Sequence, residues 1–79
     1  MPTLKIRTVD INTLSPVPCV IEIDGRVTTS TGETTIEVGY GKYSLKIRAE
    51  GYEPVNTVIT IKREREEVTV PLIPRVGLL

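Results

Sequence analysis

Apolar and polar residues alternate with a period of two through most of this chain. From Tyr43 to Ala49 every second residue is apolar, and the residues between them are Ser44, Lys46 and Arg48. This is the pattern of a β-strand with one buried and one solvated face, and no segment shows a helical period. Val, Ile and Thr make up more than a third of the residues, while Ala occurs once and Gln never. Both observations predict an all-β protein.

Turn residues divide the alternating segments into short strands. Asp24-Gly25 favours a tight hairpin turn, and glycines near residues 32, 39 and 51 mark further breaks. Pro71 lies inside the last segment, which places that strand at a sheet edge or gives it a bulge. The charged run 62–67 is expected to be the solvated tip of a hairpin between the last two strands. The expected strands cover residues 3–9, 19–23, 26–30, 34–38, 43–49, 55–62 and 68–72. Seven such strands predict a two-layer sandwich.

The apolar phase of each strand predicts the core. Leu45→Ala is therefore expected to destabilise the fold. The side chains expected to point inward are Ile6, Ile21, Ile23, Ile36, Val38, Tyr43, Leu45, Ile47, Ile59, Ile61, Val68, Val70 and Leu72.

The length of 79 residues fits a single domain spanning residues 1–79, in which 74–79 is either a docking tail or a linker remnant. Cys19 is the sole cysteine and histidine is absent, so no internal disulfide can form and no zinc site can be completed. Packing, alone or together with a partner, has to stabilise the fold. The amino-acid composition resembles that of proteins from hot habitats, because Asn, Gln, Met and Cys are scarce while Glu, Arg and Lys are abundant.

Charge and hydropathy exclude several partners. The net charge is zero, with ten basic and ten acidic residues interspersed, which argues against nucleic-acid binding. No signal-peptide pattern opens the chain and no apolar stretch is long enough to span a bilayer, so we expect no membrane insertion. Localisation stays open between the cytoplasm, by default, and the cell surface if the chain is part of a longer protein.

The candidate chemistry favours no catalytic, cofactor or metal site. Cys19 has no histidine base and lies in an apolar alternating strand, so it is expected to be a small buried hydrophobe. Alternating charges in 62–67 are typical of a solvated surface. The carboxylates lack the spacing of a calcium loop and are expected to be surface groups; they are Asp10, Glu22, Asp24, Glu33 and Glu37.

Tyrosines and the C-terminal residues are the candidates for interaction. Tyr43 shares a face with core residues, and Tyr52 follows a glycine at a strand corner, where a tyrosine often bonds its hydroxyl to backbone. Tyr40 is the tyrosine expected to be free for a ligand such as carbohydrate. Val76, Leu78 and Leu79 form an apolar tail that we expect to dock onto the domain or onto a neighbouring copy, unless the tail is a linker remnant.

The segment Gly39 to Pro54 reads GYGKYSLKIRAEGYEP. With the hairpin before it and the strand pair after it, this segment resembles the carboxypeptidase regulatory-like and PEGA domain group over residues 15–74. The resemblance implies a seven-stranded Greek-key β-sandwich of the prealbumin (transthyretin-like) type, used as an accessory module without catalytic residues in larger polypeptides. The matching residues are Gly41, Tyr43, Leu45, Ile47, Ala49, Gly51 and Tyr52.

Two functional hypotheses follow. The first is a non-catalytic structural or protein-interaction module that can self-associate through exposed sheet edges. The alternative is an accessory module that binds carbohydrate or a small apolar ligand, motivated by the tyrosines and the resemblance.

Overall fold

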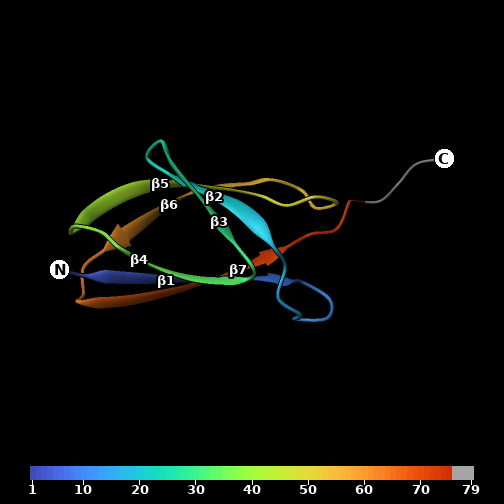
Figure 1. Cartoon of the computed structure of the whole chain (residues 1–79), viewed down its shortest axis with the longest axis horizontal. Helices are drawn as coiled ribbons and strands as arrows, with labels where there is room; N and C mark the ends of the chain where they lie inside the picture. Colours follow the sequence, from blue (N-terminus) through green and yellow to red (C-terminus); the bar gives the residue numbers. More distant parts are fainter. Residues whose placement is uncertain (76–79) are drawn as a thin grey trace.

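A computed structural model describes residues 1–75 of the chain as seven strands in two sheets (Figure 1). The sheets face each other as a sandwich and no helix occurs among the described residues, which confirms the all-β prediction. The strands are β1 Thr3–Asp10, β2 Cys19–Ile23, β3 Arg26–Ser30, β4 Glu33–Glu37, β5 Gly41–Arg48, β6 Val55–Ile61 and β7 Arg65–Leu72.

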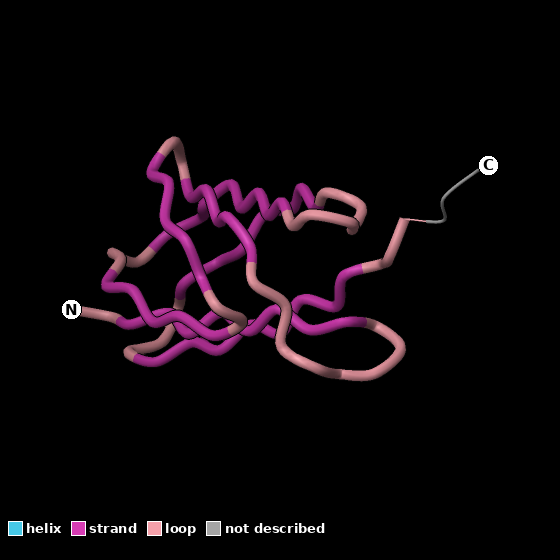
Figure 2. The backbone as a smooth tube through the Cα atoms, turned by 45° about the vertical axis from the view of Figure 1, so that its right-hand side comes forward, coloured by secondary structure: helices cyan, strands magenta, loops and turns pink. Residues whose placement is uncertain are grey.

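One sheet has three strands in the order β4-β1-β7, and the other has four in the order β3-β2-β5-β6. The chain crosses between the sheets after β1, β3, β4 and β6, as a Greek-key sandwich requires. Neighbouring strands are antiparallel except β1 and β7, which run parallel from Thr3↔Arg65 to Asp10↔Leu72. The first and last strands of the chain therefore lie side by side in one sheet (Figure 2).

The β2–β3 hairpin forms at the predicted dipeptide. Asp24 and Gly25 have φ values of 45° and 87°, and Ile23↔Arg26 is the register pair that closes the turn. Positive φ at both central residues is the type I′ arrangement, whose twist matches that of the flanking strands. The turn therefore fixes the register of the whole hairpin.

The core lies between the sheets and confirms the predicted inward faces of the strands other than β3, for which no core residue was predicted. Ile36, Tyr43, Ile59 and Val68 are partly buried against it. The other nine predicted core residues are buried, and they are joined by Leu4, Val17 and Cys19. Thr8 is also fully buried: its hydroxyl donates a hydrogen bond of 2.8 Å to the Val17 carbonyl, which satisfies its polar group.

The charged run 62–67 departs from the prediction. β6 ends at Ile61 and β7 begins at Arg65, so only residues 62–64 form the connection. The two strands are not a hairpin, because β6 belongs to the four-stranded sheet and β7 pairs with β1 in the other. Strand residues can carry charge where they point to solvent, and Arg65 and Glu67 are exposed there.

Pro71 lies in β7, the outer strand of the three-stranded sheet, and its side chain is exposed. An outer strand tolerates proline because one side of its backbone needs no ladder partner. The edge placement predicted from Pro71 is therefore confirmed.

Candidate interaction surfaces

Tyr40 lies in the turn before β5 and has 60% of its surface exposed. Its hydroxyl donates a hydrogen bond of 3.1 Å to Glu64 Oε2 in the β6–β7 connection. This bond to a carboxylate raises the pKa of Tyr40 above its ordinary value, because ionising the phenol would remove the donor and place two negative charges together. The ring is accessible, as the sequence predicts, but its hydroxyl already has a partner.

The other tyrosines are bonded within the fold. Tyr43 donates 2.9 Å to the carbonyl of Gly39. Tyr52 donates 2.7 Å to Asp10 Oδ2, whereas a backbone acceptor was expected. The bond from Tyr52 lowers the pKa of the Asp10 carboxyl and raises the pKa of the Tyr52 hydroxyl. A carboxylate at the end of β1 is a stronger acceptor than a carbonyl, which explains the correction.

The tyrosines do not form a shared stacking platform. Glu64, whose carboxylate binds Tyr40, also accepts the Thr3 N–H at the start of β1 through its backbone carbonyl. Asp10, the partner of Tyr52, is the last residue of the same strand, and at about 3.3 Å per residue it lies about 23 Å from Thr3. Tyr40 and Tyr52 therefore lie at opposite ends of the sandwich.

The Asp10 side chain organises the loop after β1. Its Oδ1 accepts the backbone N–H groups of Asn12 at 2.7 Å and Thr13 at 3.2 Å. This is the turn-stabilising geometry that aspartate favours. Within residues 1–75, no three His, Cys, Asp or Glu side chains gather in a way that could hold a metal ion.

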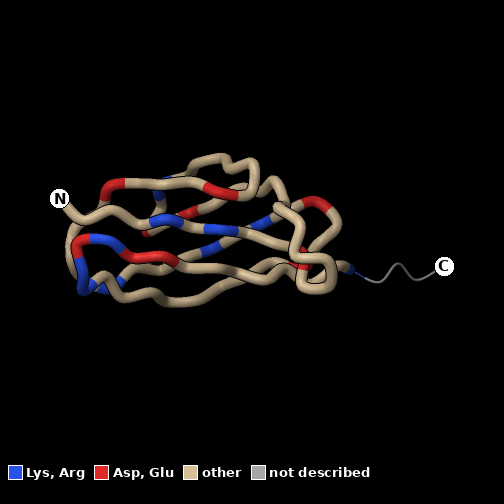
Figure 3. The backbone as a smooth tube through the Cα atoms, turned by 90° about the horizontal axis from the view of Figure 1, so that it is seen from below, with Lys and Arg blue, Asp and Glu red and all other residues tan. Residues whose placement is uncertain are grey.

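Charged side chains form a paired network on the outer face of the three-stranded sheet. Lys5 approaches Glu33 at 3.3 Å and Glu67 at 3.8 Å, and Arg7 approaches the same two carboxylates at 3.6 and 3.8 Å. The hydrogen bond from Lys5 is the main reason that the pKa of Glu33 is lowered. Figure 3 shows basic and acidic positions side by side along these strands. The signs compensate, so this face presents no single charge to a partner.

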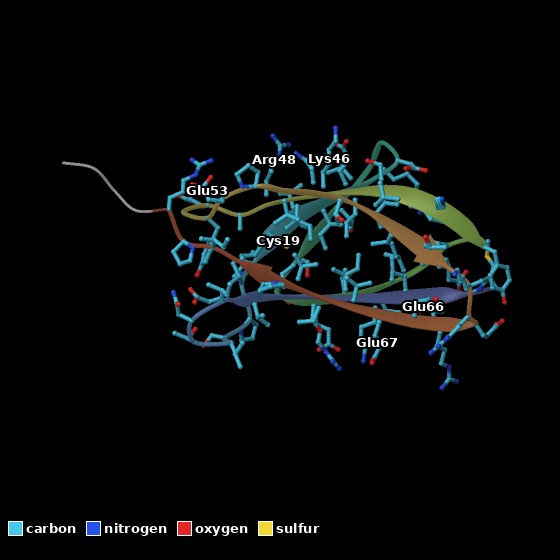
Figure 4. The ribbon with its side chains drawn as sticks, turned by 180° about the vertical axis from the view of Figure 1, so that it is seen from behind. Cys19, Lys46, Arg48, Glu53, Glu66 and Glu67 are labelled. Carbon is cyan, nitrogen blue, oxygen red and sulfur yellow. The ribbon has the colours of Figure 1, made fainter. Side chains whose placement is uncertain are left out.

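Cys19 is buried between the sheets, with 7% of its surface exposed (Figure 4). The Thr8 hydroxyl lies 3.4 Å from its Sγ atom. A thiol in this position packs as a small apolar group, as the sequence predicts.

A cleft of about 300 Å³ opens between β3 and β4, the edge strands that lie on the same side of the sandwich. Ile23, Ile36, Val38 and Tyr43 contribute its apolar lining and Val27 lies at its rim. Sequence reasoning missed this cleft, because it depends on how far two edge strands diverge, and alternation within each strand carries no such information.

Several apolar residues are exposed where β1 and β7 end. Ile11, Leu14 and Ile73 are 46, 70 and 54% exposed. The Ile11 N–H donates to the Leu72 carbonyl, which holds the two segments side by side. Val76, Leu78 and Leu79, the predicted docking residues, lie outside the described residues.

The edge strands of the four-stranded sheet have few features that would prevent pairing with another strand. β3 and β6 form these edges and contain one charged residue between them, Arg26. In the other sheet, the edge strand β4 carries glutamates, and the edge strand β7 carries Pro71 together with acidic and basic residues. The absence of charge from 55–61, between two charged segments, is the sequence signal for such an edge.

Comparisons with known proteins agree with this architecture. A crystal structure from Bacteroides fragilis, of a protein provisionally described as membrane-associated and of unknown function, is similar with a TM-score of 0.72 and 17% sequence identity. The similarity covers 98% of this chain but only 29% of that one. A comparison with curated proteins found no match. No helix long and apolar enough to cross a membrane occurs in the described part of the chain. The model of the PEGA domain family matches residues 2–74, and the chain belongs to this family.

Proposed function

We propose that this PEGA domain is a non-catalytic structural and protein-interaction module that binds other chains along the edges of its sheets. The observation that carries the proposal is that both edge strands of the four-stranded sheet, β3 and β6, are nearly uncharged. Their outward backbone groups have no strand partner in the described residues. Unpaired edges are templates for a further strand, and natural proteins usually blunt them with charge or proline.

Two further observations support an accessory role. The family resemblance implies a module that lacks catalytic residues of its own. The Bacteroides fragilis chain is longer than its similar segment, which occupies 29% of it, so this fold also occurs within a larger protein. That protein is provisionally described as membrane-associated, which supports a place beside a membrane for this module.

The experiment is a comparison of binding partners between the natural domain and an edge-blocked variant, Val27→Lys with Val58→Lys. These valines are 63 and 64% exposed on the two edge strands, so the variant should keep its fold. Cross-linking followed by mass spectrometry should identify at least one partner, either another protein or the domain itself, that the variant loses. Identical partner sets for two equally folded proteins would contradict the proposal.

The cleft between β3 and β4 supports the second candidate, binding of a small apolar ligand or a sugar with an apolar face. Its volume of about 300 Å³ is at the lower end for ligand pockets, and Tyr43 contributes an aromatic ring. A glycan array and a titration with an apolar fluorescent dye should then give saturable binding that Val27→Lys weakens, because Val27 lines the cleft and its exposed side chain can be changed without disturbing the core. Binding that is absent, or unchanged in this variant, would exclude the cleft.

A further inference from the structure

β6 has none of the features that protect sheet edges. It spans Val55–Ile61 and contains neither a charged residue nor a proline. Its pairing with β5 runs without a bulge from Gly41↔Ile61 to Ile47↔Val55. β7, the edge of the other sheet on the same side of the sandwich, has Arg65, Glu66, Glu67 and Pro71. The contrast singles out β6 as the edge that is open to another strand.

Hydrogen bonds on the far side of β5 show which way the backbone of β6 faces. Asp24 N–H donates 3.1 Å to the Ser44 carbonyl, and Ser44 N–H donates 2.7 Å to Asp24 Oδ1. The backbone groups of Ser44 therefore face β2 and leave Ser44↔Val58 as a non-hydrogen-bonded pair. It follows that the N–H and C=O groups of Val58 point away from β5.

The same alternation turns the backbone groups of Asn56 and Thr60 outward, two residues on either side of Val58. No strand of the described residues 1–75 pairs with them. The free edge thus offers donors and acceptors at three alternate residues, and this array is symmetric about Val58.

Resting on the proposed function, we propose that β6 pairs antiparallel with β6 of a second copy of this chain, about a two-fold axis at Val58. Val58 then lies opposite Val58 of the partner subunit, and Asn56 lies opposite Thr60 of the partner subunit. Each pair exchanges two hydrogen bonds, and the two four-stranded sheets become one continuous sheet.

A second copy fits this edge because a two-fold axis at Val58 places that residue opposite its own equivalent and pairs the residues on one side of it with those on the other. A charged strand would bring like charges together, whereas β6 has no charge and brings together β-branched and amide side chains, which pair well across strands. Val58, 64% exposed in one copy, gains an apolar neighbour. Such an interface should also be nearly insensitive to salt.

The other edge of the same sheet provides a matched control. The two-residue turn makes Ile23↔Arg26 a hydrogen-bonded pair, so only Val27 and Thr29 in β3 turn their backbone groups outward. Val27 is 63% exposed, almost the same as Val58. Lysine at either valine therefore adds the same charge at a similarly exposed edge position of one sheet.

Sedimentation equilibrium from micromolar to millimolar concentration tests the proposal. The natural chain should dimerise reversibly. Val58→Lys should raise the dimer dissociation constant at least about tenfold, because two lysines would face each other across the axis. Val27→Lys should change it by less than about twofold, and melting curves should show that both variants are folded.

Amide hydrogen exchange measured by NMR adds a signature that a general loss of stability would not give. The amides of Asn56, Val58 and Thr60 should exchange more slowly as concentration rises, while those of Thr57 and Ile59, already bonded to β5, should not change. A natural chain that stays monomeric, or a dimer that Val27→Lys disrupts and Val58→Lys spares, overturns the β6 pairing. Neither result refutes the proposed function, whose own test is the loss of partners from the edge-blocked variant.

Discussion

Leu45→Ala removes a side chain from the centre of the core. Leu45 is fully buried in β5 and lies between Ile23 of β2 and Thr57 of β6 in the sheet register. Three carbons at about 0.8 kcal/mol each give about 2.4 kcal/mol of lost burial. The remaining cavity brings the expected loss to about 2.7 to 5 kcal/mol. A chain of 79 residues is expected to be stable by only about 4 to 12 kcal/mol.

Thermal unfolding followed by circular dichroism measures this loss. At about 4 to 8 °C per kcal/mol, the midpoint should fall by at least about 10 °C. Ser44→Ala is the matched control, since the neighbouring Ser44 side chain is exposed and its change should stay within about 0.5 kcal/mol. If Leu45→Ala melts at the temperature of the natural chain, Leu45 does not face the core and the assigned phase of β5 is wrong.

Three further predictions concern residues outside the β5 strand. Gly32→Ala should lower the melting temperature, because Gly32 has a φ of +126° and an added Cβ would lie 2.5 Å from Pro16 Cβ; an unchanged midpoint would show that the loop relaxes freely. The bond from Tyr52 lowers the pKa of Asp10 in the folded protein. The ionised Asp10 carboxylate therefore stabilises the fold fully above the unfolded-state pKa of about 3.8, and this stabilisation is lost as pH falls through the folded-state pKa. In Asp10→Asn the free energy of unfolding should therefore fall less steeply at acid pH than in the natural chain, and an identical dependence on pH would contradict this. Cys19 should react with a thiol reagent only in denaturant, so rapid labelling of the native protein would show that it is not buried.

Alternation in the sequence was sufficient to predict which side chains face inward. Tyr43, Leu45 and Ile47 share a face because consecutive strand residues point to opposite sides, and this rule needs no knowledge of the neighbouring strands. The Asp24-Gly25 turn was equally predictable, since few dipeptides accept two positive φ values. Local rules therefore account for the inward faces of the strands other than β3 and for this hairpin.

Long-range pairing was not predictable in the same way. β7 follows β6 after three residues, yet it pairs with β1, because alternation specifies a face and not a neighbour. Glu67 was placed in a loop because its partners, Lys5 and Arg7, belong to the distant β1. The bond between Tyr52 and Asp10 joins residues 42 positions apart, and no local pattern indicates it.

The parallel pairing of β1 and β7 determines how the domain responds to mechanical force. β1 begins at one end of the molecule and β7 finishes at the opposite end (Figure 1), so a pull on the two ends draws the two strands past each other along their length. All the register pairs from Thr3↔Arg65 to Asp10↔Leu72 then bear the load together, whereas an antiparallel pair pulled from one end would open one bond at a time. The domain should therefore resist extension strongly when it is pulled through its two ends.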